Sequence, residues 1–459
     1  MANDNSSAAL VDVPGVEPLQ PESMQPATRF RWVILGLVFL GTTVNYMDRQ
    51  VLGFLAPDLR DKYHLFTDAQ FGVIQGAFAI SYALGQAMSG RWLDWIGIRV
   101  GYALALAAWS TTSILHVVAR TALGFSVVRV FLGVAESPNF PAAVKTLAEW
   151  FPKRERAIGM GVVNSGTVVG AILVPAVVPF LVNHFGWQSA FLVTGTGGLI
   201  WLILWIPIYR KPEEHPRVSP AELALIRSDP PDPTRDVPWL SLLSFPQTWA
   251  FMIGKFITDP LWWFYMSWFP SYLKKQHDLN ITKMGIPLIV IYLMASAGSM
   301  AGGLLSSAMM KRGYGVNVAR KTAMLICALA ILPVMYVTHV HELWGTVLML
   351  GLATAAHQGF SSNLYTLVPD MFPKQVTASV SGLGGTFGYG GASLFSVLTG
   401  LIVGKWTNGN YGILFLIAST GYLVAFIVIQ ILAPRLEPAI VDTAGAFPVI
   451  LNKSDDNKE

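Results

Sequence analysis

Twelve stretches of predominantly apolar residues dominate the sequence. A helix of about 20 such residues crosses the roughly 30 Å hydrocarbon core of a bilayer, and only 13% of the 459 residues are charged, against about 25% in soluble domains. We therefore predict an all-α integral membrane protein that passes through the bilayer many times. The expected spans are residues 31–55, 70–91, 98–118, 122–144, 157–182, 187–209, 247–273, 285–310, 321–339, 343–367, 377–404 and 411–433.

Several classes of function are excluded by what the sequence lacks. The single cysteine, Cys327, rules out a disulfide framework and a cysteine metal site. No phosphate-binding loop, His-Glu-x-x-His motif or dinucleotide fingerprint occurs, so we expect no metal, no cofactor and no ATP-driven reaction. The net charge of +4 is too small to indicate a nucleic-acid partner. No cluster of reactive residues faces one side, so we do not expect an enzyme.

The distribution of lysine and arginine predicts how the chain is oriented in the membrane, because these residues stay mainly on the cytoplasmic side. With the amino terminus inside, the inner segments hold 20 of these residues and the outer loops only seven. Both termini are therefore expected in the cytoplasm. Residues 1–28 are rich in Asn, Asp, Ser and Pro and lack a signal-peptide pattern, so they are interpreted as a disordered tail, and residues 434–459 as a second cytoplasmic tail.

The chain divides into two related halves. A long polar connection, residues 210–246, separates a six-span half at 29–209 from another at 247–433. Asp48 and Asp259 each lie in the first span of a half, and Phe-Pro-Lys follows the fourth span of both halves, at 151–153 and 372–374. Such a duplication is typical of transporters in which a central cleft opens alternately to either side. We predict two pseudo-symmetric six-helix halves around one central site.

Seven ionisable side chains interrupt the spans, where each costs about 2.5–3.5 kcal/mol on insertion scales and so needs a partner or a function. They are Asp48, Arg49, Arg129, Glu136, Lys145, Lys255 and Asp259. Asp48 and Glu136 are candidate proton carriers, although Asp48 with Arg49, or Glu136 with Arg129, would also serve as a fixed ion pair. Lys255 and Asp259 are four residues apart, which permits an intrahelical pair. Whether Asp259 touches a ligand is left open.

Other polar residues suggest ligand contacts and a gate. Tyr82 shares a stripe with two glutamines of its span, and Gln358 and Asn363 are suited to a hydroxylated ligand, whereas a packed core role is favoured for the neighbouring His357. Asp94 and Arg99, in the short basic loop that follows the second span, are expected to act as a latch for one conformation. The aromatic run at 262–265 is interpreted as an interfacial anchor.

These features together resemble a known family. The twelve spans and the loop from Gly90 to Arg99 resemble the major facilitator superfamily over nearly the whole chain. Asn-Tyr-Met-Asp-Arg at 45–49, the Arg129 to Glu136 pair and Glu-Trp-Phe-Pro-Lys at 149–153 look like its anion:cation symporter family. That resemblance implies the major facilitator fold, an organic-anion substrate and a proton as the coupling ion.

The resemblance also implies roles for matching positions. It places proton coupling on Asp48, Glu136 and Arg129, and substrate binding on Tyr46, Arg49, Tyr82, Lys255, Gln358 and Asn363. The segment 255–264 is similar to hexuronate transporters, and Lys255 replaces a glutamine of the aldonate and aldarate transporters. We therefore expect a monomeric, proton-coupled symporter of a hexuronate such as glucuronate or galacturonate in a bacterial cytoplasmic membrane. An aldonate, aldarate or other organic-anion symporter and a non-transporting sensor are the alternatives.

Overall fold

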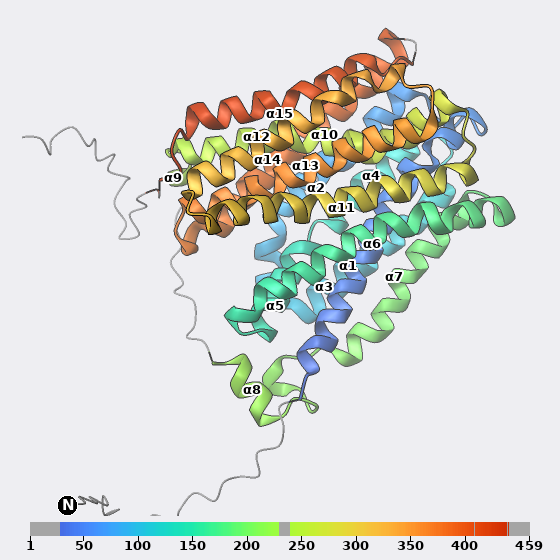
Figure 1. Ribbon diagram of the computed structural model, residues 1–459. Coiled ribbons are helices and arrows are strands. Elements are labelled where there is room, and N and C mark those ends of the chain that lie inside the picture. Colours follow the sequence, from blue (N-terminus) through green and yellow to red (C-terminus); the bar gives the residue numbers. More distant parts are fainter. Residues whose placement is uncertain (1–27, 229–238, 408, 438, 440–459) are drawn as a thin grey trace, which may run out of the picture.

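The computed structural model describes residues 28–228, 239–407, 409–437 and 439. Within these ranges the regular secondary structure is helical throughout (Figure 1). The predicted disordered tail lies outside the described residues except for Thr28, and so does most of the predicted carboxyl-terminal tail.

Twelve membrane-length segments follow one another in the predicted order. The first half comprises α1 (Phe30–Asp61), α2 (Asp68–Ile96), α3 (Ile98–Leu115) continued by η1 (His116–Val118), α4 (Ala122–Glu136) followed by α5 (Asn139–Trp150), α6 (Lys153–Phe185) and α7 (Gln188–Ile208). The connection holds η2 (Pro212–Glu214), α8 (Pro220–Ile226) and α9 (Trp239–Leu242). The second half comprises α10 (Pro246–His277), α11 (Ile281–Lys311), α12 (Val316–Ile331) continued by η3 (Leu332–His339), α13 (Leu343–Met371), α14 (Lys374–Leu401) continued by η4 (Ile402–Trp406), and α15 (Gly412–Leu432).

The predicted fold class is confirmed, and the spans differ in polarity according to their place in the bundle. Eight segments of the described chain are long and apolar enough to cross a membrane by length and composition alone. The other four, α2, α4 with α5, α10 and α13, each carry buried ionisable or amide side chains, among them Gln75, Arg129, Glu136, Lys255 and Asn363. Polar side chains on a membrane helix normally face the interior of the bundle. These four segments therefore supply much of the lining of the central site.

The duplication predicted from sequence extends to the backbone. Pro152 caps α6 with φ −62° and ψ 151°, and Pro373 caps α14 with φ −63° and ψ 152°. The preceding phenylalanines, Phe151 and Phe372, both have φ −126° and end the helix before. Extended backbone before a proline is enforced by the clash with its ring. Two Phe-Pro-Lys segments thus make the same helix-to-helix corner in the two halves.

The fourth span is broken, which its hydropathy did not indicate. Ser137 and Pro138 separate α4 from α5. Proline lacks the N–H that would continue the backbone ladder, so α4 ends at Glu136, with its carboxylate close to free helix carbonyls. Because a helix carboxyl end disfavours negative charge, Glu136 needs a cation nearby.

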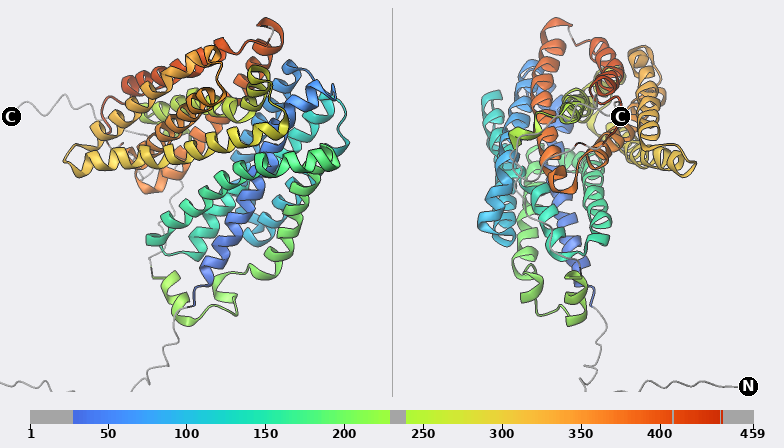
Figure 2. Two further views of the ribbon diagram at one scale, coloured as in Figure 1. Left: turned by 45° about the vertical axis from the view of Figure 1, so that its right-hand side comes forward. Right: turned by 90° about the vertical axis from the view of Figure 1, so that its left-hand side faces the viewer.

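The two halves meet at one end and diverge at the other. Helices α8 and α9 lie at the diverging ends of the first and second halves, well apart from each other (Figures 1 and 2). At the opposite end the halves are in close contact: a Cβ added to Gly72 of α2 would lie 2.5 Å from the Ser396 carbonyl oxygen and 2.8 Å from the Cα of Gly400, both on α14. Glycine is required there because the two helix backbones touch. We call this contact the closed end, and the end near α8 the linker end.

Ion pairs and hydrogen bonds between the halves gather at the closed end. Lys274, near the end of α10, contacts Asp58 at 2.8 Å and Asp61 at 3.3 Å, both in the last turn of α1. The Gln75 amide donates to the Ser267 hydroxyl at 2.7 Å. At the linker end, by contrast, a Cβ added to Gly90, Gly303 or Gly382 would meet nothing within 4 Å. The structure is therefore sealed at the closed end and open at the linker end.

Candidate functional site

A buried ion pair between α1 and α4 forms the centre of the first half. Arg49 Nε and Nη2 both donate to Glu136 Oε2, at 3.0 and 2.8 Å. The side chain of Glu136 is fully buried and that of Arg49 is 6% exposed. Oε1 of Glu136 has no hydrogen-bond partner among the described residues. Glu136 thus pairs with Arg49 and not with Arg129, the partner that sequence spacing suggested.

Aromatic rings from both halves surround the Arg49 guanidinium. Its Cζ lies 4.7–5.6 Å from the ring centres of Tyr46, Phe78, Tyr82 and Trp263, the last of these on α10. Tyr389 of α14 packs against Tyr82 with ring centres 4.3 Å apart. Such cation–π contacts hold a guanidinium strongly when it is removed from water. Arg49 therefore lies at the interface of the two halves.

The predicted interfacial anchor at 262–265 was wrong, because these rings point into the protein. Trp263 faces Arg49, and Trp262 stacks on the His357 imidazole with ring centres 4.9 Å apart. Tyr265 is fully buried. Aromatic residues are common at both bilayer interfaces and in ligand sites, and composition does not separate the two.

Asp48 and Arg129 form a second polar group beside the first pair. Asp48 Oδ1 accepts a hydrogen bond of 2.7 Å from the Ser113 hydroxyl of α3, and its Oδ2 has no partner within the described part of the chain. Arg129 Nη2 donates to the Arg49 backbone carbonyl at 3.2 Å, while its buried Nε is unpaired among the same residues. Unsatisfied atoms of this kind normally mark sites that hold water, ions or substrate.

The corresponding polar group of the second half lies on α10. Lys255 Nζ is 2.6 Å from Asp259 Oδ2 and donates to the Tyr365 hydroxyl of α13 at 2.7 Å. The Lys255 side chain is only 4% exposed and that of Asp259 is 17% exposed. The intrahelical pair expected from the four-residue spacing is therefore present, and Tyr365 is a partner that no sequence pattern indicated.

The charges of this central region balance. The six ionisable groups described above comprise three carboxylates, Asp48, Glu136 and Asp259, and three cations, Arg49, Arg129 and Lys255. Each buried charge needs compensation, since an unpaired one costs several kcal/mol. With all six groups ionised, this set of side chains carries no net charge.

The remaining predicted ligands lie on α13 and occupy different positions. Gln358 is half-buried. Asn363 is fully buried, and its amide nitrogen donates to the backbone oxygens of Gly302 and Gly359 at 3.0 and 2.9 Å. In this conformation Asn363 joins α13 to α11, and its contact with a ligand stays a prediction. His357 is buried and hydrogen-bonded to the Tyr422 hydroxyl at 2.7 Å, as its expected core role requires.

Among the described residues, the two predicted gating residues contact partners within the first half. Asp94 forms an ion pair with Lys145 of α5, which also donates to the Gly90 carbonyl at 3.0 Å. Arg99 donates to the Ile206 carbonyl at 2.8 Å, in the last turn of α7. Asp94 and Arg99 thus tie the linker ends of helices in one half together, and their part in gating stays a prediction.

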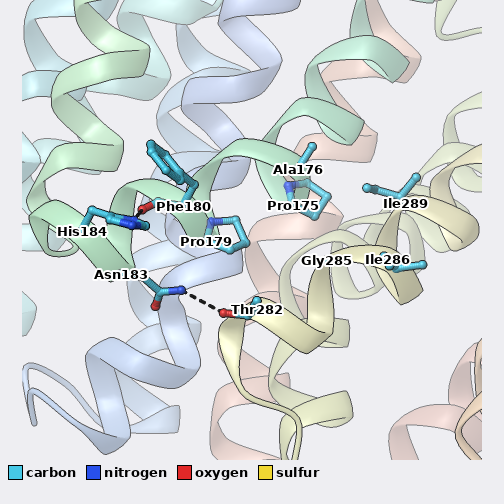
Figure 3. Close-up of a pocket in the computed structure, with 10 residues that line it drawn as sticks. All are labelled: Pro175, Ala176, Pro179, Phe180, Asn183, His184, Thr282, Gly285, Ile286 and Ile289. Carbon is cyan, nitrogen blue, oxygen red and sulfur yellow. Dashed lines mark hydrogen bonds between the residues drawn. The ribbon is translucent and has the colours of Figure 1, made fainter.

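A separate pocket of about 410 Å³ lies near the closed end. Figure 3 shows it between α6 and α11, where Asn183 donates to Thr282 at 2.9 Å. Its walls are mainly prolines and aliphatic side chains, including Pro175, Pro179 and Ile286. None of the six balanced charges lines it, so it is distinct from the central site.

Comparison with known proteins places these features in context. The family model described as Major Facilitator Superfamily matches residues 38–396. The hexuronate transporter of Escherichia coli K12 is 27% identical over 83% of this chain and 89% of its own length. The D-galactonate transporter of E. coli O6:H1 is 28% identical over 84% and 90%. The galacturonate transporter of Dickeya chrysanthemi is 30% identical over 65% and 88%.

Solved structures show the same fold. A bacterial homologue of the human lysosomal transporter Spinster, in an inward-facing and occupied conformation, aligns with a TM-score of 0.66 at 18% identity, covering 89% of this chain and 96% of that chain. A D-xylose-proton symporter aligns with a TM-score of 0.69 at 13% identity, covering 91% and 99%. With twelve spans in two related halves and a family match over most of its length, this multi-pass membrane protein belongs to the Major Facilitator Superfamily.

Proposed function

We propose that this protein is a proton-coupled symporter that carries a hexuronate such as glucuronate or galacturonate into the cell. Relatives named for hexuronate and galacturonate transport support the substrate class. The neutral cluster of three carboxylates and three cations supports the coupling. The proposed transport mechanism follows from these two observations.

The charge balance is the observation that carries the coupling. A hexuronate brings one negative charge into a region whose six buried groups already sum to zero. Leaving one buried charge without compensation costs several kcal/mol, and about 1.4 kcal/mol corresponds to a factor of ten in affinity. A proton taken up by one of the buried carboxylates restores neutrality. Substrate and proton therefore favour binding of each other, which is the requirement for coupled transport.

Arg49 and Lys255 are the proposed ligands of the substrate carboxylate. They lie on opposite halves, and each is now held by an acid, Glu136 for Arg49 and Asp259 for Lys255. A planar guanidinium binds a carboxylate with two parallel hydrogen bonds. Tyr46, Tyr82 and Gln358 would bind the sugar hydroxyls, and the rings around Arg49 would pack against the apolar face of the sugar.

Protonation of Glu136 is the step that would free Arg49 for the substrate. A neutral carboxylic acid holds the guanidinium more weakly than a carboxylate does, so the substrate carboxylate can replace it. Asp48, held by Ser113 and with its Oδ2 unpaired among the described residues, would pass protons along the route to the site. Arg129, which donates to the Arg49 backbone carbonyl, is the proposed third member of this coupling group.

The orientation of the chain makes this structure the inward-open state. The predicted inner segments of the sequence hold 20 lysine and arginine residues and the outer loops seven, which favours the cytoplasm for the linker end. The closed end, with Lys274 between Asp58 and Asp61, would then be the outer gate. Inward opening would release substrate and protons, and rocking of the halves about the central site would return the empty protein outward.

Competition for uptake tests the substrate assignment. Proteoliposomes containing the protein are supplied with labelled glucuronate and an excess of unlabelled galacturonate, galactonate or galactarate. Galacturonate is expected to compete strongly and the dicarboxylate galactarate weakly, because the site would neutralise one added charge. Lys255→Gln should weaken this preference. Stronger competition by galactonate or galactarate would favour an aldonate or aldarate symporter instead, to which relatives of similar identity point.

A further inference from the structure

The Lys255–Asp259 pair has no proton-carrying role in the mechanism proposed so far. Asp259 is bound through Oδ2 to an ammonium that is itself a proposed substrate ligand. In the duplicated architecture it occupies the first span of its half, as Asp48 does in the other half. A carboxylate in direct contact with a substrate ligand must respond when the substrate arrives.

The surroundings of Asp259 leave its carboxylate dependent on Lys255. Gly388 of α14 lies against it so closely that an added Cβ would overlap Oδ2. Glycine offers no side-chain donor, and within the described part of the chain Lys255 is the hydrogen-bonding partner recorded for Asp259. An ionised carboxylate that loses its only partner inside a protein is strongly disfavoured relative to the neutral acid.

The other titratable groups around this pair do not replace Lys255. On α13, the neutral Tyr365 hydroxyl already accepts a hydrogen bond from Lys255. His357, also on α13, is hydrogen-bonded to Tyr422 of α15. Tyr389 of α14 packs on Tyr82. Across the interface on α1, Arg49 is held by Glu136. Substrate and Asp259 therefore compete for one ammonium.

We propose that Asp259 takes up a proton when the substrate carboxylate displaces it from Lys255, so that Asp259 itself carries the proton that compensates the substrate charge at Lys255. The inference rests on the proposed function. A proton passes from water to a carboxylate oxygen of Asp259, and Lys255 remains an ammonium that exchanges one carboxylate for another. When the substrate leaves, the proton returns to water and the original pair forms again. The pair and its ligand are neutral at both stages.

Two substitutions separate this role from a structural one. Asp259→Asn leaves Lys255 without a carboxylate, so glucuronate should bind more tightly and with one proton fewer. Lys255→Gln leaves Asp259 permanently protonated, so glucuronate should bind more weakly but again with one proton fewer. If the Lys255–Asp259 pair were only structural, the two variants would not both bind glucuronate with one proton fewer. Asp370→Asn, which removes the carboxylate of an ion pair with Arg320 in the same half, is the matched control and should keep the wild-type number.

The number of protons is measured on purified protein in detergent, from the glucuronate affinity at several pH values and from the proton uptake seen by an indicator dye. One linked proton changes affinity by about tenfold per pH unit. The pH dependence of affinity should therefore be about tenfold per unit less steep in both variants than in the wild type and in Asp370→Asn. An unchanged pH dependence in Asp259→Asn or in Lys255→Gln would overturn the proposal.

Failure of the proposed function would look different. If wild-type protein neither binds nor accumulates glucuronate, the substrate assignment fails before any variant is compared. If the wild type accumulates glucuronate under a proton gradient while both variants bind with the wild-type number of protons, only the role of Asp259 is lost. Circular dichroism and elution as a single species confirm that each variant is folded before it is measured.

Discussion

Replacing Glu136 by glutamine removes the negative charge that balances Arg49 and leaves the shape of the side chain at position 136 almost unchanged. Glu136 Oε2 accepts two charge-assisted hydrogen bonds, at 3.0 and 2.8 Å, in a fully buried position. Removing one member of such a pair costs about 3–5 kcal/mol because the other charge stays buried. The glutamine oxygen still accepts one neutral hydrogen bond, so we expect the lower end, about 3 kcal/mol. The empty variant should therefore be clearly less stable to heat than the wild type.

Substrate binding returns a carboxylate to Arg49 and so recovers this cost. At about 1.4 kcal/mol per factor of ten, 3 kcal/mol corresponds to glucuronate binding up to roughly a hundredfold tighter. With glutamine at position 136, Arg49 binds and releases glucuronate without uptake of a proton there, so Glu136→Gln should exchange internal for external glucuronate but accumulate it far less against a gradient.

The assay compares exchange with gradient-driven accumulation in proteoliposomes, together with thermal unfolding with and without glucuronate. Glu149→Gln is the matched control, since that acid accepts a hydrogen bond of 2.7 Å from Tyr209 away from the central site. Wild-type accumulation by Glu136→Gln, or an affinity equal to that of the wild type, would refute the assignment of Glu136 as a coupling acid.

Two further predictions concern the closed end and the linker. Gly72→Ala places a Cβ 2.5 Å from the Ser396 carbonyl oxygen, so the conformation with the closed end sealed should lose population. Amide exchange near residues 68–76 and 396–404 should then rise, and unchanged exchange there would contradict the inferred closure. Burial lowers the pKa of His215 from its ordinary 6.5, and the charges of Arg210 and Arg217 add to this. The docked linker thus favours neutral His215, so the docked linker is most stable above pH 6.5 and loses stability as the pH drops below that value. Amide exchange in α8, corrected for intrinsic rate, should therefore rise from pH 7.5 to 5.5. In His215→Gln this exchange should become independent of pH.

Hydropathy predicted the spans well because it reports a physical requirement. Every backbone group in lipid must be hydrogen-bonded within its own helix, so apolar length and helix length are tied. The helices run several residues beyond the predicted spans, for instance to Asp61 in α1 and to His277 in α10. Hydropathy marks the lipid-covered part only, whereas a helix continues into water until a cap or a proline ends it.

The buried charges of the candidate site could be selected from sequence, and of their two ion pairs only Lys255 with Asp259 was expected. An isolated charge in an apolar span stands out from sequence, which is why Asp48, Arg49, Glu136 and Lys255 could be selected. Which acid meets which base depends on how helices 80 or more residues apart cross, whereas spacing along one helix offered only Arg129 as an alternative partner for Glu136. Tyrosines such as Tyr365 and Tyr389 were missed because a tyrosine in a membrane helix is common and carries no charge.

Gradient-dependent uptake of labelled glucuronate by proteoliposomes tests the central claim most directly. The charge balance predicts that an inward-directed proton gradient drives glucuronate above its external concentration, and that a protonophore abolishes this accumulation. Without a gradient the same protein should only bring glucuronate to equal concentrations on both sides. Equal uptake with and without the gradient would contradict proton coupling, and binding without any uptake would indicate a sensor instead of a symporter.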